Sequence, residues 1–232
     1  MKNTITILIP CYNEIKTIEI IVSRILKTEI KEKEIIIVDD NSNDGTKEIL
    51  KSKISPLVDK VIYHDRNLGK GACIRTGIKY VKNQIVIIQD ADLEYDPNEY
   101  PKLIQPIVDF KADVVYGSRF KGSEGKRVLY FWNRVANYIL TVFSNICTNI
   151  NLSDMETGFK CFKTDAIKSI NIQENGFGFE PEVTAKLAKK KFKFFEVGVS
   201  YQGRTYEEGK KIKLVDGVKA LKTLIKYRFI KK

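Results

Sequence analysis

Four carboxylates are concentrated in the nine residues "QDADLEYDP" (89–97), namely Asp90, Asp92, Glu94 and Asp96. Two aspartates spaced i, i+2 can converge on one ion where the chain turns at the end of a strand. Carboxylate oxygens are hard ligands, which Mg²⁺ and Mn²⁺ prefer. No histidine or cysteine accompanies them in this stretch, which argues against zinc. The pattern therefore favours a magnesium or manganese site.

A divalent cation held by few protein ligands usually completes its coordination with water and phosphate oxygens. The expected ligand is therefore a nucleoside diphosphate. The stretch "NLGKGACIRTG" (67–77) lacks the spacing of a P-loop, and no G-x-G-x-x-G follows the first predicted strand. These observations argue against a P-loop NTPase and against a dehydrogenase. The only histidine, His64, is interpreted as an ordinary residue at a strand end.

Regular elements must position these acids, and the first half of the chain alternates short β-branched runs with helical patterns. The predicted strands are 4–10, 34–40, 60–65, 84–92 and 113–120, and the predicted helices are 17–26, 45–54, 69–81 and 98–110. This alternation indicates right-handed βαβ units and a parallel sheet. Ligands bind outside the carboxyl ends of the strands in such sheets.

Polar residues follow all five of these strands, as expected for one ligand-binding rim. They are Asn13, Glu14, Asp39, Asp40, Asn41, Asp65, Arg66, Asn67, Asp90, Asp92, Ser118 and Arg119. The second half is less regular. We predict helices at 128–146, 181–191 and 216–229, a strand at 192–201, and a loop at 154–163 that leads into a strand or turn. No internal repeat or linker is visible, so the sequence indicates one domain.

The net charge of +11, from 40 Lys and Arg against 29 Asp and Glu, suggests an anionic partner: nucleic acid, an acidic membrane or a phosphorylated ligand. A lysine-rich soluble surface explains the charge equally well. The basic residues are scattered rather than clustered in a stripe, which disfavours nucleic acid. The four cysteines form no C-x-x-C pair, and no signal peptide or run of about 20 apolar residues is present. A reducing, cytoplasmic location is expected.

Six stretches together resemble a known family: "ILIPCYNE", "EIIIVDDNSNDGT", "NLGKGACIRTG", "IVIIQDADLEYDP", "DVVYGSRF" and "DMETGFKCFK". In this order they are similar to the family 2 glycosyltransferases of the GT-A fold, in the branch of the dolichyl-phosphate mannose synthases and dolichyl-phosphate glucosyltransferases. The resemblance runs from about residue 4 to about residue 212. It implies a three-layer α/β/α fold with a mostly parallel sheet. It also implies a single catalytic domain over 1–232, with a nucleotide-sugar half (1–120) and an acceptor half (121–232).

The resemblance further implies roles for individual residues. Those expected at the nucleotide are Pro10, Tyr12, Glu14, Val38, Asp39, Asp40, Lys70, Asp90, Ala91 and Asp92. Asp90 and Asp92 would bind Mg²⁺ or Mn²⁺, with Glu94 as a third metal ligand. Similar synthases often have Gln at the position of Glu94, so the extra charge here bears on metal preference.

The same resemblance implies an inverting transfer of mannose or glucose from a GDP- or UDP-hexose to a polyprenyl or dolichyl phosphate. Asp92, Arg119, Arg134 and Arg204 would form the catalytic set. Arg119 and Arg134 are assigned to the acceptor phosphate and Arg204 to the donor diphosphate, since arginine suits phosphate oxygens. An acceptor phosphate is already ionised and needs no strong base. Asp154 is assigned to orienting sugar or acceptor groups.

The last predicted helix is basic and amphipathic, with Lys219, Lys222, Lys226, Arg228, Lys231 and Lys232 beside an apolar face. It predicts peripheral contact with the cytoplasmic face of a membrane. A membrane-anchored partner, or simple packing of this helix on the core, are the alternatives. Three other functions are alternatives: a transferase with a sugar or other alcohol acceptor in surface-polysaccharide assembly, a nucleotidyltransferase, and a nucleic-acid-binding module. The last is disfavoured because it leaves the polar strand ends unexplained.

Overall fold

The computed structural model describes residues 4–122, 127–128, 130–205, 207–209 and 214–229. Its centre is a seven-stranded sheet in the order β3-β2-β1-β4-β6-β5-β7. The strands are β1 (Ile5–Cys11), β2 (Lys33–Asp39), β3 (Lys60–Tyr63), β4 (Ile85–Ile88), β5 (Val114–Ser118), β6 (Lys160–Lys163) and β7 (Phe194–Gly198). Only β6 runs antiparallel to its neighbours, β4 and β5. The predicted mostly parallel sheet is confirmed.

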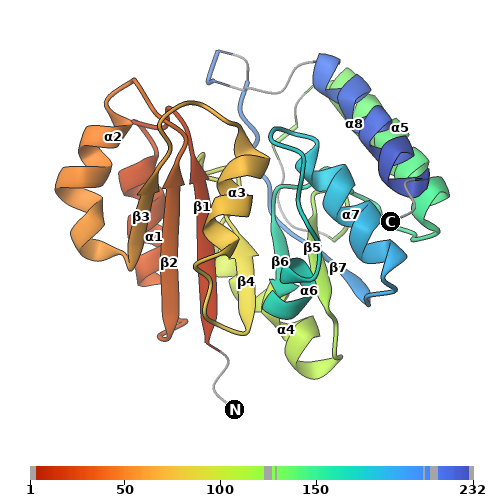
Figure 1. The fold of residues 1–232 in the computed structure, drawn as a ribbon, viewed down its shortest axis with the longest axis horizontal. Coiled ribbons are helices and arrows are strands. Elements are labelled where there is room, and N and C mark those ends of the chain that lie inside the picture. The colour runs from red at the N-terminus through yellow and green to blue at the C-terminus, as the bar shows by residue number, and fades with distance from the viewer. Residues whose placement is uncertain (1–3, 123–126, 129, 206, 210–213, 230–232) are drawn as a thin grey trace.

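Helices cover both faces of this sheet (Figure 1). They are α1 (Ile18–Lys27), α2 (Thr46–Ile49), α3 (Lys70–Ile78), α4 (Tyr100–Asp109), α5 (Phe131–Thr148), α6 (Thr164–Lys168), α7 (Phe179–Lys189) and α8 (Leu214–Phe229). In β1, Ile7 packs with α1 and α4 on one face, while the next residue, Leu8, packs with α3 and α7 on the other. Successive side chains of a strand point to opposite faces, so the apolar runs supply two cores and three layers.

Two predicted elements differ from the structure. The segment predicted as one helix over 45–54 is a short α-helix followed by a π-helical turn, Leu50–Ile54, and a 3-10 turn, Ser55–Leu57. Pro56 lacks the N–H that an α-helix would need there. The strand predicted over 84–92 ends at Ile88, and Leu93 has a positive φ of 66°. The acidic stretch is therefore a tight loop at the strand end rather than part of the strand.

The parallel strands bring the polar loops to one edge of the sheet, as the sequence predicted. The loops after β1 and β2 are bound to each other there. The Asn13 backbone N–H donates to Ser42 Oγ (2.9 Å) and the Glu14 N–H donates to Thr46 Oγ1 (2.9 Å). Asn13 and Asn41 both adopt left-handed backbone conformations, which asparagine tolerates better than most residues. The rim of the sheet is therefore held in shape by its own loops.

Candidate active site

A cavity of about 680 Å³ lies at this edge, between the strand ends and the helices α5, α7 and α8. Eleven residues predicted for the site line it: Pro10, Tyr12, Glu14, Asp40, Lys70, Asp90, Ala91, Asp92, Glu94, Arg119 and Arg204. The opposite wall is more apolar and includes Ala136, Ile139 and Leu140 of α5 with Val218 and Leu221 of α8. Segments from the whole length of the chain thus meet around one space.

Four residues assigned to the site from the sequence do not line the cavity: Val38, Asp39, Arg134 and Asp154, which is described below. The side chains of Val38 and Asp39 are buried, and Asp39 accepts hydrogen bonds from the Ser42 hydroxyl (2.6 Å) and backbone N–H (3.2 Å). Asp39 therefore shapes the turn after β2. Arg134 is exposed on α5, with its guanidinium 5.7 Å from the centre of the Phe120 ring. Its neighbour Asn133 lines the cavity instead.

Two cations from distant parts of the chain pair with the two aspartates of the acidic loop, Asp90 and Asp92. Lys70 Nζ lies 2.9 Å from Asp90 and 3.0 Å from Glu180. Burial alone would lower the pKa of Lys70, but Asp90 and Glu180 raise it well above its usual value, so the ammonium stays charged. Arg204 Nη2 lies 3.0 Å from Asp92. Each aspartate of the pair therefore has its own counter-ion.

Arg204 is also the centre of a second group of contacts. Its guanidinium donates to both oxygens of Glu14 at 3.2 Å, and its backbone N–H donates to Glu94 (2.8 Å). Tyr201 donates its hydroxyl to the other Glu94 oxygen (2.9 Å). Glu94 thus anchors the segment 201–204 to the acidic loop. Burial, with the nearby charges of Glu94 and Asp90, raises the pKa of Asp92 to about 7.

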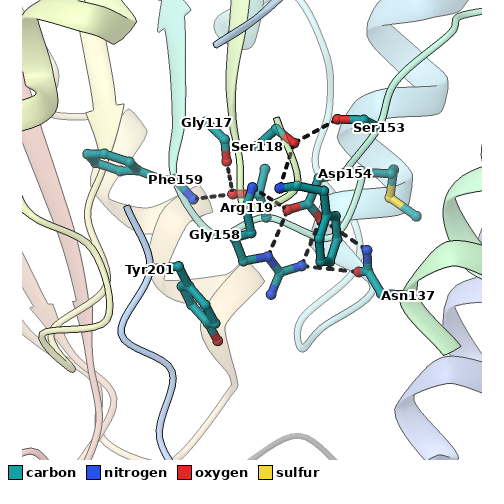
Figure 2. Close-up of polar contacts among 12 residues, drawn as sticks. Gly117, Ser118, Arg119, Asn137, Ser153, Asp154, Gly158, Phe159 and Tyr201 are labelled. Atoms are coloured by element: carbon teal, nitrogen blue, oxygen red, sulfur yellow. Dashed lines mark hydrogen bonds and ion pairs between the residues drawn. The ribbon is translucent and has the colours of Figure 1, made fainter. Parts of the chain in front are cut away.

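Arg119 lies at the end of β5 and is held by Asp154, which is fully buried (Figure 2). The Arg119 Nε and Nη2 groups donate to the two oxygens of Asp154 at 2.7 and 2.8 Å, and Asn137 accepts a further bond from Nη2 (3.1 Å). Tyr201 stacks over the guanidinium at 5.2 Å. Among the described residues, Nη1 has no hydrogen-bond partner. In this structure Asp154 therefore orients Arg119 rather than facing the cavity.

Several polar residues of the site were missed from the sequence. Glu156 and Glu180 line the cavity, and Lys160 lies fully buried behind it, donating to the carbonyls of Met155 (3.0 Å) and Thr157. Burial and the charge of Glu180 raise the pKa of Glu156 to about 8, and burial lowers the pKa of Lys160 to about 8. The motif "DMETGFK" contains Glu156 and Lys160, but nothing in their type or spacing separates them from surface charges.

His64 makes more contacts than its interpretation as an ordinary strand-end residue implies. Its Nδ1 lies 2.7 Å from Asp40, and its Nε2 lies 3.0 Å from the Thr76 hydroxyl. Asp40 also accepts the backbone N–H groups of Leu68 (2.9 Å) and Gly69 (2.6 Å). His64 is therefore part of the hydrogen-bond network that fixes Asp40 in the cavity wall, rather than an ordinary strand-end residue.

Two groups of side chains offer ligand atoms for a metal ion. In the described part of the chain, the one set of three His, Cys, Asp or Glu ligand atoms within 4.8 Å of each other is Asp40, His64 and Cys73. Asp40 already accepts two backbone N–H groups and contacts His64, and burial raises the pKa of the Cys73 thiol, which disfavours the thiolate ligand. Asp90 and Asp92 do fit Mg²⁺ or Mn²⁺: they are crowded carboxylates in the cavity wall, and a dication would relieve their repulsion.

Comparisons with known proteins agree with this architecture. The chain is 26% identical over 212 residues to an undecaprenyl-phosphate mannosyltransferase of Micrococcus luteus, covering 88% of this chain and 85% of that one. It is 28% identical over 231 residues to an uncharacterized protein of Methanocaldococcus jannaschii, covering 97% and 92%.

Solved structures of glucosyl-3-phosphoglycerate synthase from Mycobacterium tuberculosis share the fold. The complex with UDP has a TM-score of 0.75 at 17% identity, covering 99% of this chain and 82% of that one. The complex with Mn²⁺ and UDP-glucose has a TM-score of 0.73 at 18% identity, covering 99% and 80%. The sheet order and the layers are those of a GT-A glycosyltransferase. The model of glycosyl transferase family 2 matches residues 6–170, so the chain belongs to this family of glycosyltransferases.

Proposed function

We propose that this glycosyltransferase transfers mannose or glucose from GDP-mannose or UDP-glucose to a polyprenyl phosphate, with inversion and with Mg²⁺ or Mn²⁺. The main support is a cavity that joins two chemically different walls. Asp90, Asp92, Arg119 and Arg204 form a wall suited to phosphate groups, and α5 with α8 forms an apolar wall suited to a lipid chain. The lipid-phosphate acceptor of the Micrococcus relative and the UDP-glucose bound by the mycobacterial neighbour agree with this assignment.

In this function the acidic residues bind the cation and the arginines bind the phosphate groups. Asp90 and Asp92 would hold a divalent cation, which would stabilise the charge on the leaving diphosphate. Arg204 turns from Asp92 and Glu14 toward the donor diphosphate. Arg119, pre-oriented by Asp154, presents its free Nη1 to the acceptor phosphate.

Arg134 lies on α5 beside Phe120, and we assign it to binding the acceptor phosphate when that group enters the site. The ionised phosphate oxygen attacks the anomeric carbon directly and needs no strong base.

The apolar wall continues onto an exposed face. On α5, Phe131, Trp132, Tyr138, Ile139 and Ile146 are each at least half exposed, and Phe229 of α8 is 72% exposed. Figure 1 shows α5 and α8 side by side at one end of the molecule. Within the described residues, no helix is both long and apolar enough to cross a membrane.

The exposed aromatic residues of α5 and the exposed lysines of α8, Lys219, Lys222 and Lys226, suit the surface of an anionic bilayer. The predicted Lys231 and Lys232 lie outside the described residues. We therefore propose that this face rests on the cytoplasmic leaflet and receives the lipid acceptor there.

The enzymatic proposal is tested with a panel of GDP- and UDP-hexoses, polyprenyl phosphate, and Mn²⁺ or Mg²⁺, followed by isolation of the glycolipid. Transfer is expected for one donor, and Asp92→Ala is expected to abolish it. Arg134→Ala is expected to impair acceptor use more than donor use. Transfer to a sugar or other alcohol acceptor but never to the lipid phosphate would replace the proposed acceptor class. No transfer from any nucleotide sugar would overturn the proposal.

The membrane proposal is tested separately by sedimentation with vesicles of neutral or anionic phospholipid. The wild-type protein is expected to bind the anionic vesicles. Trp132→Ser combined with Phe131→Ser is expected to weaken binding, whereas Phe110→Ser, an exposed aromatic at the end of α4, serves as the control. Equal binding by both variants would exclude the α5 face as the contact.

A further inference from the structure

Several residues around the cavity have a buried polar atom that makes no hydrogen bond among the described residues. The four atoms are Asn133 Nδ2, Glu156 Oε1, Glu180 Oε2 and Arg204 Nε. Buried polar atoms are nearly always paired in folded proteins, so each unpaired one calls for an explanation. A group of them around one cavity indicates that a polar ligand completes the hydrogen bonds. Two of the four are donors, and the other two are carboxylate oxygens that can accept.

The two acceptors lie next to the diphosphate site. Glu180, in the first turn of α7, is 3% exposed, and its other oxygen takes the ion pair with Lys70 (3.0 Å). Lys70 in turn holds Asp90 (2.9 Å). The segment that carries Glu156 packs closely on the same aspartate, because a Cβ added at Gly158 would lie 2.2 Å from Asp90 Oδ2. Both carboxylates therefore border the place where the group attached to the diphosphate must lie.

The chemistry of Glu156 and Glu180 indicates which part of the donor they could bind. Glu180, paired with Lys70, is a carboxylate that accepts hydrogen bonds and repels phosphate, and the carboxyl group of Glu156 can exchange hydrogen bonds with hydroxyl groups. A hexose attached to the diphosphate offers several hydroxyl donors at this position. We propose that Glu156 and Glu180 bind hydroxyl groups of the donor hexose and so select which hexose is transferred. This inference rests on the proposed function, since it assigns a subsite within the same donor site.

The test compares a nucleotide sugar with its own nucleoside diphosphate. Dissociation constants of UDP, UDP-glucose, GDP and GDP-mannose are measured by calorimetry with Mn²⁺ for the wild type, Glu180→Gln and Glu156→Gln. The pair that the wild type prefers is then repeated with monodeoxy analogues of the hexose. Glu182→Gln is the matched control, because Glu182 lies on the same helix and is equally buried but does not line the cavity. Far-UV circular dichroism checks that each variant is folded.

Glu180→Gln is expected to weaken binding of the nucleotide sugar about 10- to 100-fold, as for loss of a hydrogen bond to a charged group, and Glu156→Gln about 3- to 10-fold, as for loss of a neutral one. Binding of the nucleoside diphosphate should change far less. A monodeoxy analogue that lacks the hydroxyl contacted by a given Glu should bind the wild type more weakly than the full nucleotide sugar does. The variant of that Glu should bind the two ligands almost equally. Equal losses for nucleotide and nucleotide sugar would mean that Glu180 acts only through Lys70, and would overturn the inference. A ratio of the two dissociation constants, for nucleotide sugar and nucleoside diphosphate, that is unchanged in both variants would also overturn it. A wild type that binds no nucleotide would instead refute the proposed function.

Discussion

Replacing Asp154 should lower the free energy of unfolding, and its contacts indicate by how much. Its carboxylate is fully buried and accepts four hydrogen bonds: three from Arg119, through the backbone N–H, Nε and Nη2 (2.9, 2.7 and 2.8 Å), and one from Asn137 (3.2 Å). Breaking a buried ion pair from one side costs about 3–5 kcal/mol. The Arg119 side chain is 17% exposed, so water in the cavity can hydrate it in part. We expect Asp154→Ala to lower the free energy of unfolding by about 3 kcal/mol, near the bottom of that range.

Urea unfolding followed by circular dichroism measures this change, and a fall in Tm of about 6–12 °C should accompany it. Glu19→Ala is the control. It breaks an ion pair with Lys53 in which the two side chains are 43% and 61% exposed, and it should cost at most about 1 kcal/mol. The double variant Arg119→Met with Asp154→Leu should recover much of the loss, because neither charge is then left unpaired. A loss below about 1 kcal/mol for Asp154→Ala, or no recovery in the double variant, would refute the reasoning.

Three further predictions follow from the same network. Gly158→Ala should abolish transfer while the protein stays folded, because its Cβ would lie 2.2 Å from Asp90 Oδ2; activity and circular dichroism measure this, and an active variant would contradict it. Lys70→Met should weaken nucleotide binding more than Lys70→Arg, since it leaves Asp90 and Glu180 without their shared cation; calorimetry decides. Glu156, with its pKa raised to about 8, keeps a proton that the unfolded chain has already lost, so stability should fall as pH rises from about 5 to 8. Urea titrations at several pH values should therefore show Glu156→Gln gaining about 1 kcal/mol or more over the wild type across this range, and parallel pH profiles would disprove it.

The fold and the rim of the site could be read from the sequence because both depend on local patterns. Apolar runs such as "TILIP" and "IVII" specify buried strands, and the chain order of strands and helices specifies a parallel sheet with its polar ends on one side. The antiparallel strand β6 was harder to predict. It enters the sheet between β4 and β5, and a strand of four residues carries almost no periodicity.

Pairings across the sequence could not be predicted, because residue type does not say which partner the fold will bring. Asp154 and Arg119 are 35 residues apart and Lys70 and Asp90 are 20 apart. Nothing in the sequence distinguishes Lys160 from the other lysines of a basic chain, yet it is fully buried with its ammonium 4.2 Å from the centre of the Tyr116 ring. Its burial depends on carbonyl groups and a ring that come together only in the folded chain.

The ion pairs of the acidic loop also bear on how the ligand enters. Asp92 and Arg204 pair at 3.0 Å, and the proposed function uses both for a metal-bound diphosphate, one for the cation and the other for the phosphate. In that function, a cation that replaces Arg204 at Asp92 would free the guanidinium for the diphosphate, and a diphosphate that draws Arg204 away would leave Asp92 buried beside Glu94 and Asp90 without a counter-ion. Cation and diphosphate together would each replace the partner that the other removes. We therefore expect their binding to be cooperative, and linkage requires the coupling to be equal in both directions.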